Sequence, residues 1–398
     1  MNLPRRSLAV IAATNLAQLP IALRQLLVVL LGHHISGSYA VAGAAGAACG
    51  VGLAISAPLA GRLLARLGHR RVLLGFGMLH ASALIGLSFA ASPAGYLTLA
   101  AVAGLATPPV TSSSRAILPT LVPAPALSRA YALNAVGQEL LYVAGPLAVT
   151  VILGYVGPAA ALLAFTAVGT IALLLDAAII PPCGSREEPG ARAWTGPARV
   201  AVLTLVGVHF AYMVGMGAMW VLLPAFATEH GRPNQTGLLV SVWSAASLLG
   251  GLLLVKRGRT GGLVVSYLAL LAALALTSGT LLLPRTVPQM GLALLAFGLA
   301  LAPWLATTDE LMVRTVPPHR SAESYGWQQT AGQLGVAAGS ASSGLVNDQF
   351  GTRAAFLLVS TTLIAGFALA YRQRAGLEAA TGRECYRSSH SDIRGAPS

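Results

Sequence analysis

Six ionisable residues lie within long apolar stretches of the sequence, and these residues could carry chemistry. They are Arg24, Arg115, Glu139, His209, Asp309 and Glu310. A charged group in hydrocarbon is unfavourable, so such side chains usually face a cavity or one another and mark a transport pathway. A carboxylate there can take up and release a proton, and an arginine can balance it or hold an anion. We predict these six as the proton-coupling candidates.

Glu139 is the preferred proton carrier among them. It lies about ten residues inside its apolar run, which is mid-membrane at about 1.5 Å per residue. Arg115 or Arg24 is the expected partner. The alternative is a permanent Glu139–Arg115 ion pair that only holds two helices together.

The other candidates each have a structural alternative. Asp309 and Glu310 lie near the end of a span, where side chains can reach interfacial water, and we expect the same of Asp176. His209 could be a hydrogen-bonded packing residue. The adjacent His33 and His34 point about 100° apart on a helix, so no metal site is expected there.

A stripe of large side chains suggests a place for substrate. His209, Tyr212, Met216 and Trp220 recur at helical spacing, and Met and aromatic side chains make adaptable apolar surfaces. Amides in other spans could hydrogen-bond substrate. The alternative is that the stripe is helix packing and the amides tie helices together. The predicted substrate-cavity residues are Asn15, Gln18, Gln25, Tyr212, Met216, Trp220 and Trp304, with further amides at Asn134, Gln138, Gln328, Gln329 and Gln333.

The composition identifies the elements that position these residues. The chain has 398 residues, of which 55% are hydrophobic and 9% charged, with a mean hydropathy of +0.72. Soluble proteins carry about a quarter charged residues, so this is a polytopic α-helical membrane protein. The net charge of +13 does not indicate nucleic-acid binding, because the basic residues lie in short loops between spans. The three distant cysteines predict neither a disulfide framework nor a metal site, and we expect no cofactor.

The apolar runs predict twelve spans in two six-helix halves. The halves are residues 1–181 and 199–373, joined by a cytoplasmic linker at 182–198 and followed by a disordered cytoplasmic tail at 374–398. Pro20, Pro108, Pro109 and Pro303 should kink their spans. The spans are predicted at 8–31, 38–60, 72–91, 95–118, 129–152, 158–181, 199–223, 235–255, 262–283, 288–313, 322–346 and 353–372.

The distribution of basic residues sets the expected orientation. If the N-terminus is cytoplasmic, 21 of the 25 basic residues lie in cytoplasmic segments, Arg24 lies within span one, and only Arg232, Arg285 and Arg353 lie outside. This bias follows the positive-inside rule and predicts that both termini are cytoplasmic. The ratio of 24 arginines to one lysine is typical of a GC-rich bacterial genome. We therefore expect a multi-pass protein of the bacterial inner membrane.

The two halves also repeat each other. A shift of 194 residues lays Val122-Pro123 on Val316-Pro317, and a shift of 190 residues aligns two basic loops. Two repeated six-span halves are typical of secondary transporters, with the pathway between the halves.

One of these loops is more specific. Gly61-Arg62-Leu63-Leu64-Ala65-Arg66-Leu67-Gly68-His69-Arg70-Arg71 resembles the signature loop of the major facilitator superfamily, and the resemblance extends over about residues 5–373. It implies a gating loop with Gly61, Arg66, Gly68, Arg70 and Arg71 as its main residues. It also implies that spans one, four, seven and ten line a central cavity.

The sequence departs from that family at several positions. The acidic residue of the signature loop is replaced by Ala65, and by Val255 in the second copy, and an arginine expected near Ala100 is absent. The family's carboxylate joins a charge network that latches one conformation, so this chain must latch differently or more weakly. Gly145-Pro146 resembles the centre of a motif of proton-driven exporters, although a Gly-Pro pair also simply bends a membrane helix.

These observations predict a secondary transporter that works by alternating access. The preferred hypothesis is proton-coupled export of a hydrophobic or amphipathic drug or metabolite, as in bacterial efflux members of the family. The alternative is a proton-coupled importer of a polar or carboxylated solute, with Arg24 and Arg115 as anion anchors. A membrane enzyme or scaffold is disfavoured because no P-loop, His-Glu-x-x-His pattern or nucleophile constellation is present. The expected partners are a small-molecule substrate, protons and the lipid bilayer, and we expect a monomer.

Overall fold

The computed structural model describes residues 5–111, 113, 121–122, 124–179, 197–257, 261–316 and 321–380. All regular structure in these ranges is helical, and ten of the helices are long and apolar enough to cross a membrane. The 52-residue α14 contains two of the predicted spans, because Gly351 breaks its helical backbone at φ +83°. The shorter apolar helix α5 belongs to span four. The predicted twelve-helix fold is confirmed.

The helices of the first half are α1 (Arg5–Ala17), α2 (Leu19–Ser36), α3 (Tyr39–Leu67), α4 (His69–Ser88), α5 (Pro93–Leu105), α7 (Ala124–Tyr155) and α8 (Gly157–Ile179). Those of the second half are α9 (Pro197–Glu229), α10 (Thr236–Arg257), α11 (Leu263–Ser278), α12 (Val287–Gly298), α13 (Leu301–Thr315) and α14 (Ser321–Arg372). Two short 3-10 helices, Pro233–Gln235 and Gly279–Leu282, lie beside α10 and α11.

Prolines interrupt three of the spans, as the sequence predicts. Span one divides into α1 and α2 two residues before Pro20, and span ten divides into α12 and α13 ahead of Pro303. In span four, α5 ends at Leu105, just before Pro108 and Pro109. A proline cannot donate to the helical ladder and clashes with the preceding turn, so backbone polar groups inside the membrane are freed near these points. Those groups need side-chain partners.

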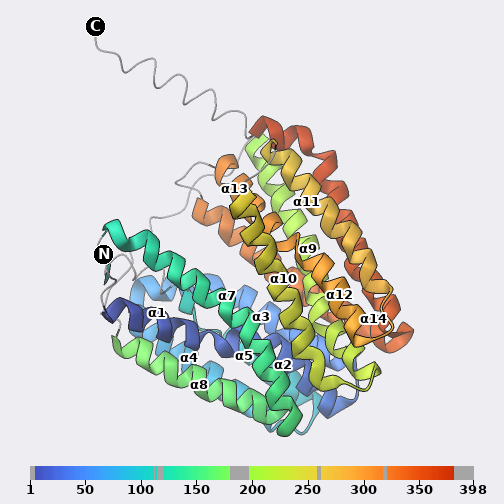
Figure 1. Cartoon of the computed structure of the whole chain (residues 1–398). Coiled ribbons are helices and arrows are strands. Elements are labelled where there is room, and N and C mark those ends of the chain that lie inside the picture. The colour runs from blue at the N-terminus through green and yellow to red at the C-terminus, as the bar shows by residue number, and fades with distance from the viewer. Residues whose placement is uncertain are drawn as a thin grey trace.

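Each half has its own hydrophobic core. Leu23, Leu84 and Tyr96 are fully buried in the first half, and Tyr267 and Trp304 are fully buried in the second. Figure 1 shows the blue-to-green helices and the yellow-to-red helices as two bundles. The bundles meet at one end and diverge toward the end that carries the start of α1 and the end of α14 (Figure 1).

We name the two ends by this arrangement. The sealed end carries the turns after α2, α4, α7, α9 and α11, together with the turn at Gly351. Serine or threonine N-caps start three helices there, at Ser38, Ser92 and Thr286, each accepting a hydrogen bond from a backbone N–H three residues on. The open end carries the first residues of α1, α7 and α9 and the last residues of α3 and α10.

Candidate transport site

Close contact between α3 and α14 holds the halves together at the sealed end. A side chain on Gly43 would overlap the backbone carbonyl of Ser340, and one on Gly344 would overlap the carbonyl of Tyr39. Small residues let helix backbones approach this closely, and van der Waals packing then stabilises the contact. The two helices therefore form one side of a tight seal between the halves.

The second side of the seal joins α7 to α10. A side chain on Gly237 would overlap the carbonyl oxygen of Pro146, and the Ser241 hydroxyl donates to the Val143 carbonyl at 2.8 Å. Pro146 lies in the predicted Gly145-Pro146 pair, and α7 continues through it. The close approach of Gly237 shows that this part of α7 is an inter-half contact surface.

Apolar and polar contacts fill the space between these helix pairs. Val29 and Tyr39 of the first half form a buried cluster with Val221 and Ala225 of the second half, together with Ala42. Deeper in the membrane, the Gln25 amide donates to the Ser340 hydroxyl at 2.9 Å, which in turn donates to the Gly217 carbonyl at 3.0 Å. Gln25, a predicted substrate-cavity residue, therefore crosses between the halves within the seal.

The contact continues one turn past Gln25, where Gly50 meets Gln333 and Ala337, and beyond that turn the two halves separate. On α3, the contact stripe through Gly43 and Gly50 continues at helical spacing to Ala57, which is exposed. On α14, the stripe through Ser340 continues to Gln329, which is also exposed, and to Gly326, where an added Cβ would have no neighbour within 4 Å. The facing stripes of α3 and α14 are therefore uncovered from about mid-membrane to the open end, and we call the region between them the opening.

Glu139 lies at this opening. It shares a face of α7 with Val143 and Pro146, which contact α10, but it lies one turn nearer the open end and is exposed. Helical side chains tilt toward the helix N-terminus, and α7 begins at the open end, so the Glu139 carboxylate is directed away from the seal. The facing surface of α10 continues with Ser244, Ala245 and Leu248, none of which carries a charge.

Amide side chains connect span one to span five on the neighbouring face of α7. Gln18 accepts hydrogen bonds from Thr111 at 3.2 Å and from Gln138 at 3.3 Å. Asn15 donates to Asn134 at 3.3 Å and to the Ile11 carbonyl at 2.8 Å. Asn15 and Asn134 are buried, whereas Gln18 and Gln138 retain partial exposure. In this conformation the predicted substrate amides bond to one another, and Gln18 and Gln138 are the accessible ones.

Arg24 points into the first half and not into the opening. Its Nη1 donates to the Thr107 hydroxyl at 2.5 Å, and Thr107 donates in turn to the carbonyls of Ala103 and Gly104. These carbonyls belong to the last turn of α5, where the helix dipole is negative. Arg24 is 6% exposed, and its Nε has no hydrogen-bond partner among the described groups. The guanidinium thus compensates for the interrupted backbone of span four.

Asp176 corrects an expectation. The sequence places it near a span end, within reach of interfacial water, but it is only 1% exposed and accepts a hydrogen bond from Thr14 at 3.1 Å. It lies between α1 and α8, inside the first half. A turn of helix separates it from the span end, and packing of α1 over α8 covers it. It is therefore a buried intramembrane carboxylate that hydropathy alone did not single out.

The large side chains of span seven divide into two groups. Tyr212 and Met216 are buried in the core of the second half together with Trp304 of span ten, and the Tyr212 and Trp304 rings lie 4.6 Å apart. They do not line the opening here, so core packing explains this part of the stripe. Trp220 differs, because it packs against the cores of both halves.

His209 is also buried, at 6% exposure. Its Nδ1 lies 3.4 Å from the Gln328 amide of α14, and its Nε2 would be 3.0 Å from a side chain added at Gly332. Both neighbours belong to α14, so His209 packs α9 against α14 within the second half. The structure places it away from the opening in this conformation.

The remaining acidic candidates lie on α13. Glu310 forms an ion pair with Arg314 one turn along, at 2.6 Å between Oε1 and Nη2. Asp309 lies on the exposed face of α13, opposite the face that buries Trp304 and Thr308. Arg115, the expected partner of Glu139, lies outside the described residues.

The predicted gating loop covers the end of α3, the turn at Gly68 and the first residues of α4. Gly68 has φ +78°, a conformation that residues with a side chain rarely adopt, which explains the glycine at this position. Arg66, Arg70 and Arg71 are exposed, and Gly61 is partly exposed. His69 contacts the Ser113 hydroxyl at 2.9 Å, linking the start of span three to span four.

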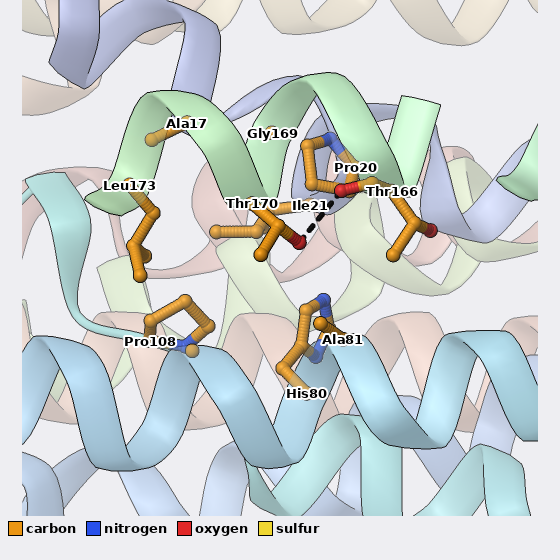
Figure 2. Close-up of a pocket in the computed structure, with 11 residues that line it drawn as sticks. Ala17, Pro20, Ile21, His80, Ala81, Pro108, Thr166, Gly169, Thr170 and Leu173 are labelled. Carbon is orange, nitrogen blue, oxygen red and sulfur yellow. Dashed lines mark hydrogen bonds between the residues drawn. The ribbon is translucent and has the colours of Figure 1, made fainter. Parts of the chain in front are cut away.

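A small cavity also lies inside the first half. Figure 2 shows His80, Thr166 and Thr170 among its mostly apolar lining residues. The His80 Nδ1 contacts the Ala103 carbonyl at 2.7 Å, while its Nε2 has no partner in the described part of the chain. Because α1, α2, α4 and α8 enclose this cavity, it does not lie on the path between the halves. In the same described ranges, no cluster of three potential metal ligands occurs.

Comparison with known proteins identifies the family. The family model described as Major Facilitator Superfamily matches twice, over residues 10–207 and 205–384. The chain therefore belongs to the major facilitator superfamily, and it is a multi-pass membrane transporter. A comparison with curated protein sequences gave no match.

Solved structures share the fold at low sequence identity. The human organic anion transporter MFSD10 is 20% identical with a TM-score of 0.65, over 92% of this chain and 100% of that one. A bacterial homologue of the human lysosomal transporter Spinster, in an inward-facing and unoccupied conformation, is 15% identical with a TM-score of 0.71, over 96% and 98%. A POT family transporter in complex with 5-aminolevulinic acid is 11% identical with a TM-score of 0.76, over 94% and 97%.

Proposed function

We propose that this transporter exports hydrophobic or amphipathic small molecules, such as drugs or secondary metabolites, in exchange for protons. It acts as a monomer in the inner membrane of a bacterium, with both termini in the cytoplasm. The positive-inside distribution supports this orientation, because the loops at the open end carry most of the arginines. The structure is then the inward-facing state, which is able to receive substrate from the cytoplasm or from the inner leaflet.

The position of Glu139 is the observation that carries the proposal. It is an intramembrane carboxylate on the inter-half face of α7, directly beside the seal, with an uncharged surface of α10 opposite. Alternating access changes the surroundings of this face more than those of any residue inside a half. A carboxylate whose surroundings alternate between water and protein can bind a proton from one side and release it to the other.

The proposed cycle follows from competition at this site. Substrate enters the opening and favours release of the Glu139 proton to the cytoplasm. The loaded protein then rearranges so that the opening faces outside. A proton from outside binds Glu139, favours release of substrate, and allows the return step. Substrate binding thus drives the outward step and proton binding drives the return step. Exchange requires this, because neither ligand then crosses without the other.

The character of the opening supports a lipophilic substrate. The partly exposed amides Gln18 and Gln138 offer hydrogen-bonding surface without net charge, and Trp220, which packs against both cores beyond Gly217, closes the sealed side with an aromatic ring. The fold neighbours carry substrates as different as organic anions, nucleosides and 5-aminolevulinic acid by their descriptions, so the fold does not choose among substrate classes.

Everted membrane vesicles with an acidic lumen test the proposal. Lipophilic compounds are added to the exposed cytoplasmic face while a pH-sensitive dye reports the gradient. We expect wild-type vesicles to lose the gradient, and Glu139→Gln vesicles to respond at least about 10-fold more slowly, since the amide cannot carry a proton. Asp176→Asn and Glu310→Gln are matched controls that neutralise two other intramembrane carboxylates, and both should respond as wild type.

Two results would contradict the assignment. If Glu139→Gln responds normally while Asp176→Asn does not, the proton is carried inside the first half instead. If no compound collapses the gradient at normal expression, export itself is refuted.

The alternative function is proton-coupled import of a carboxylated solute, with Arg24 as an anion anchor. Arg24 is a buried cation without a carboxylate partner among the described residues, which favours this role. Its direction into the first half, onto Thr107, argues against it. Uptake of radiolabelled organic acids into whole cells separates the two, because an importer should lose uptake in Arg24→Met whereas an exporter shows none in either form.

A further inference from the structure

The sealed end contains a charged contact that joins the two halves. Asp348 lies just before the turn between the two spans of α14. One carboxylate oxygen accepts a hydrogen bond from the Ser38 hydroxyl at 2.6 Å and from the Ala40 N–H at 2.9 Å, and the other accepts from the Tyr39 N–H at 3.0 Å. These donors lie more than 300 residues away, at the first turn of α3.

The position of Asp348 is unfavourable within its own helix. It lies three residues before Gly351, where the first helix of α14 ends, and a negative charge at a helix C-terminus opposes the helix dipole. The N-terminus of α3 offsets this unfavourable interaction, because its free N–H groups and the positive end of its dipole stabilise an anion. Asn347 of the same helix also hydrogen-bonds to the carboxylate, but the three hydrogen bonds from α3 come from the opposite half and exist only while the halves are in contact.

We propose that Asp348, Ser38, Tyr39 and Ala40 form an outer latch that holds the transporter in its inward-facing state. The outer latch closes the seal on the side away from the opening, outside the apolar cluster of Val29 and Tyr39. When the opening turns outward, α3 and α14 must part at this end, and all three hydrogen bonds break together.

The outer latch also accounts for a departure in the sequence. By resemblance to the family, an acidic residue is expected at position 65 of the signature loop, where this chain has alanine, and at Val255 in the second copy. Both positions lie in the last turn of a helix at the open end, in α3 and in α10. The chain thus lacks the carboxylates that would secure the open end when it closes, but has one that secures the sealed end. The balance of charge contacts favours the inward-facing state.

Other charged groups near the outer latch are arranged around Tyr39. The His33 ring stacks on the Tyr39 ring at 3.9 Å, and Glu229 interacts electrostatically with Tyr39 from the end of α9. Neither donates to Asp348. Glu229→Gln is therefore a matched control, because it removes a carboxylate from the same region without touching the three hydrogen bonds.

The test measures the distance between the halves at the sealed end. Spin labels are placed at Ala91→Cys in the loop after α4 and at Arg285→Cys in the loop before α12, both exposed. Cys183 and Cys385 are replaced by serine, and Cys49 is retained because it is fully buried. The protein is purified whole and reconstituted in lipid nanodiscs for pulsed electron paramagnetic resonance.

We expect the unaltered latch to give mainly short distances. Asp348→Ala should add a longer-distance population, lowering the closed-to-open ratio about 10-fold, which equals about 1.4 kcal/mol. Asp348→Asn, which keeps an acceptor but loses the charge, should give an intermediate shift. Glu229→Gln should match the unaltered protein.

Two outcomes overturn the outer latch. One is a distance distribution for Asp348→Ala that matches the unaltered protein. The other is an equal shift in Glu229→Gln, which would show a general effect of charge at this end. The inference rests on the alternating access proposed above, but the measurement needs no substrate or proton gradient. It can therefore fail while the transport assay succeeds, and the reverse.

Discussion

At the scale of single residues, the direction in which a charged side chain points within the membrane decides whether its role is structural or functional. Arg24 and Glu139 both lie deep in apolar spans, and sequence pattern treats them alike. The structure turns Arg24 onto the end of α5 through Thr107, and turns Glu139 toward the other half. A group held by fixed partners stabilises one arrangement, whereas a group at a moving interface can change its protonation.

Thr107→Val tests the structural role of Arg24. Valine has nearly the same shape but leaves the Arg24 Nη1 without its hydroxyl acceptor in a buried site. We expect the free energy of unfolding to fall by about 1–3 kcal/mol, measured as a lower apparent melting temperature of the purified protein. Thr98→Val is the control, because Thr98 is exposed in the same span and its hydroxyl donates to the Ala94 carbonyl of its own helix. Equal melting temperatures for the two variants would refute this role.

At the scale of elements, glycines lie at two kinds of close helix contact. Contacts within one half are fixed, whereas contacts between the halves must open during transport. Gly43 meets the backbone of Ser340 in the other half, whereas Gly104 meets the backbone of Cys49 within the first half. The same chemical change at these two positions should therefore have different effects.

Gly43→Ala should hold the sealed end apart. We expect longer distances between labels at positions 91 and 285, with a melting temperature close to that of the parent. Gly104→Ala should lower the melting temperature and leave the distances unchanged, since its methyl group strains a contact that never opens. Gly75→Ala, where an added Cβ has no neighbour within 4 Å, should change neither. A distance shift in Gly104→Ala would contradict the division into fixed and opening contacts.

The number of spans and the places where they are interrupted could be predicted from the sequence. Apolar run lengths gave the spans, and prolines at positions 20, 108 and 303 marked the three interruptions. Asp176 was misplaced because a hydropathy profile does not show which neighbouring helix covers a side chain. Asp348 was not singled out, because its donors at Ser38–Ala40 become adjacent only when the halves meet. Local pattern determines helices, while contacts distant in sequence determine the site.

At the scale of the whole molecule, two separate cores with one sealed edge let each half move as a unit. The contact between the halves rests on small residues, a short apolar cluster and a few hydrogen bonds. Either half keeps its own core when these contacts break, so the opening can change sides without unfolding.

Labelling from opposite sides of the membrane tests the direction of the opening. Ala57→Cys and Gln329→Cys lie on the facing stripes of α3 and α14 beyond the seal, and both are exposed. With Cys183 and Cys385 replaced by serine, a membrane-impermeant maleimide should modify them in everted vesicles at least about 10-fold faster than in right-side-out vesicles, since only the open end admits water. Arg285→Cys, at the sealed end, should show the opposite preference. Faster labelling of position 57 or 329 from outside would reverse the orientation.

Arg24 has a consequence for how the protein is made. An arginine near the centre of a span raises the free energy of insertion by about 2.5–3.5 kcal/mol, and the break before Pro20 weakens this span further. Its partner Thr107 lies 83 residues later and is synthesised only after two more spans have entered the insertion machinery. We therefore expect stable integration of the first span to follow synthesis of the fourth.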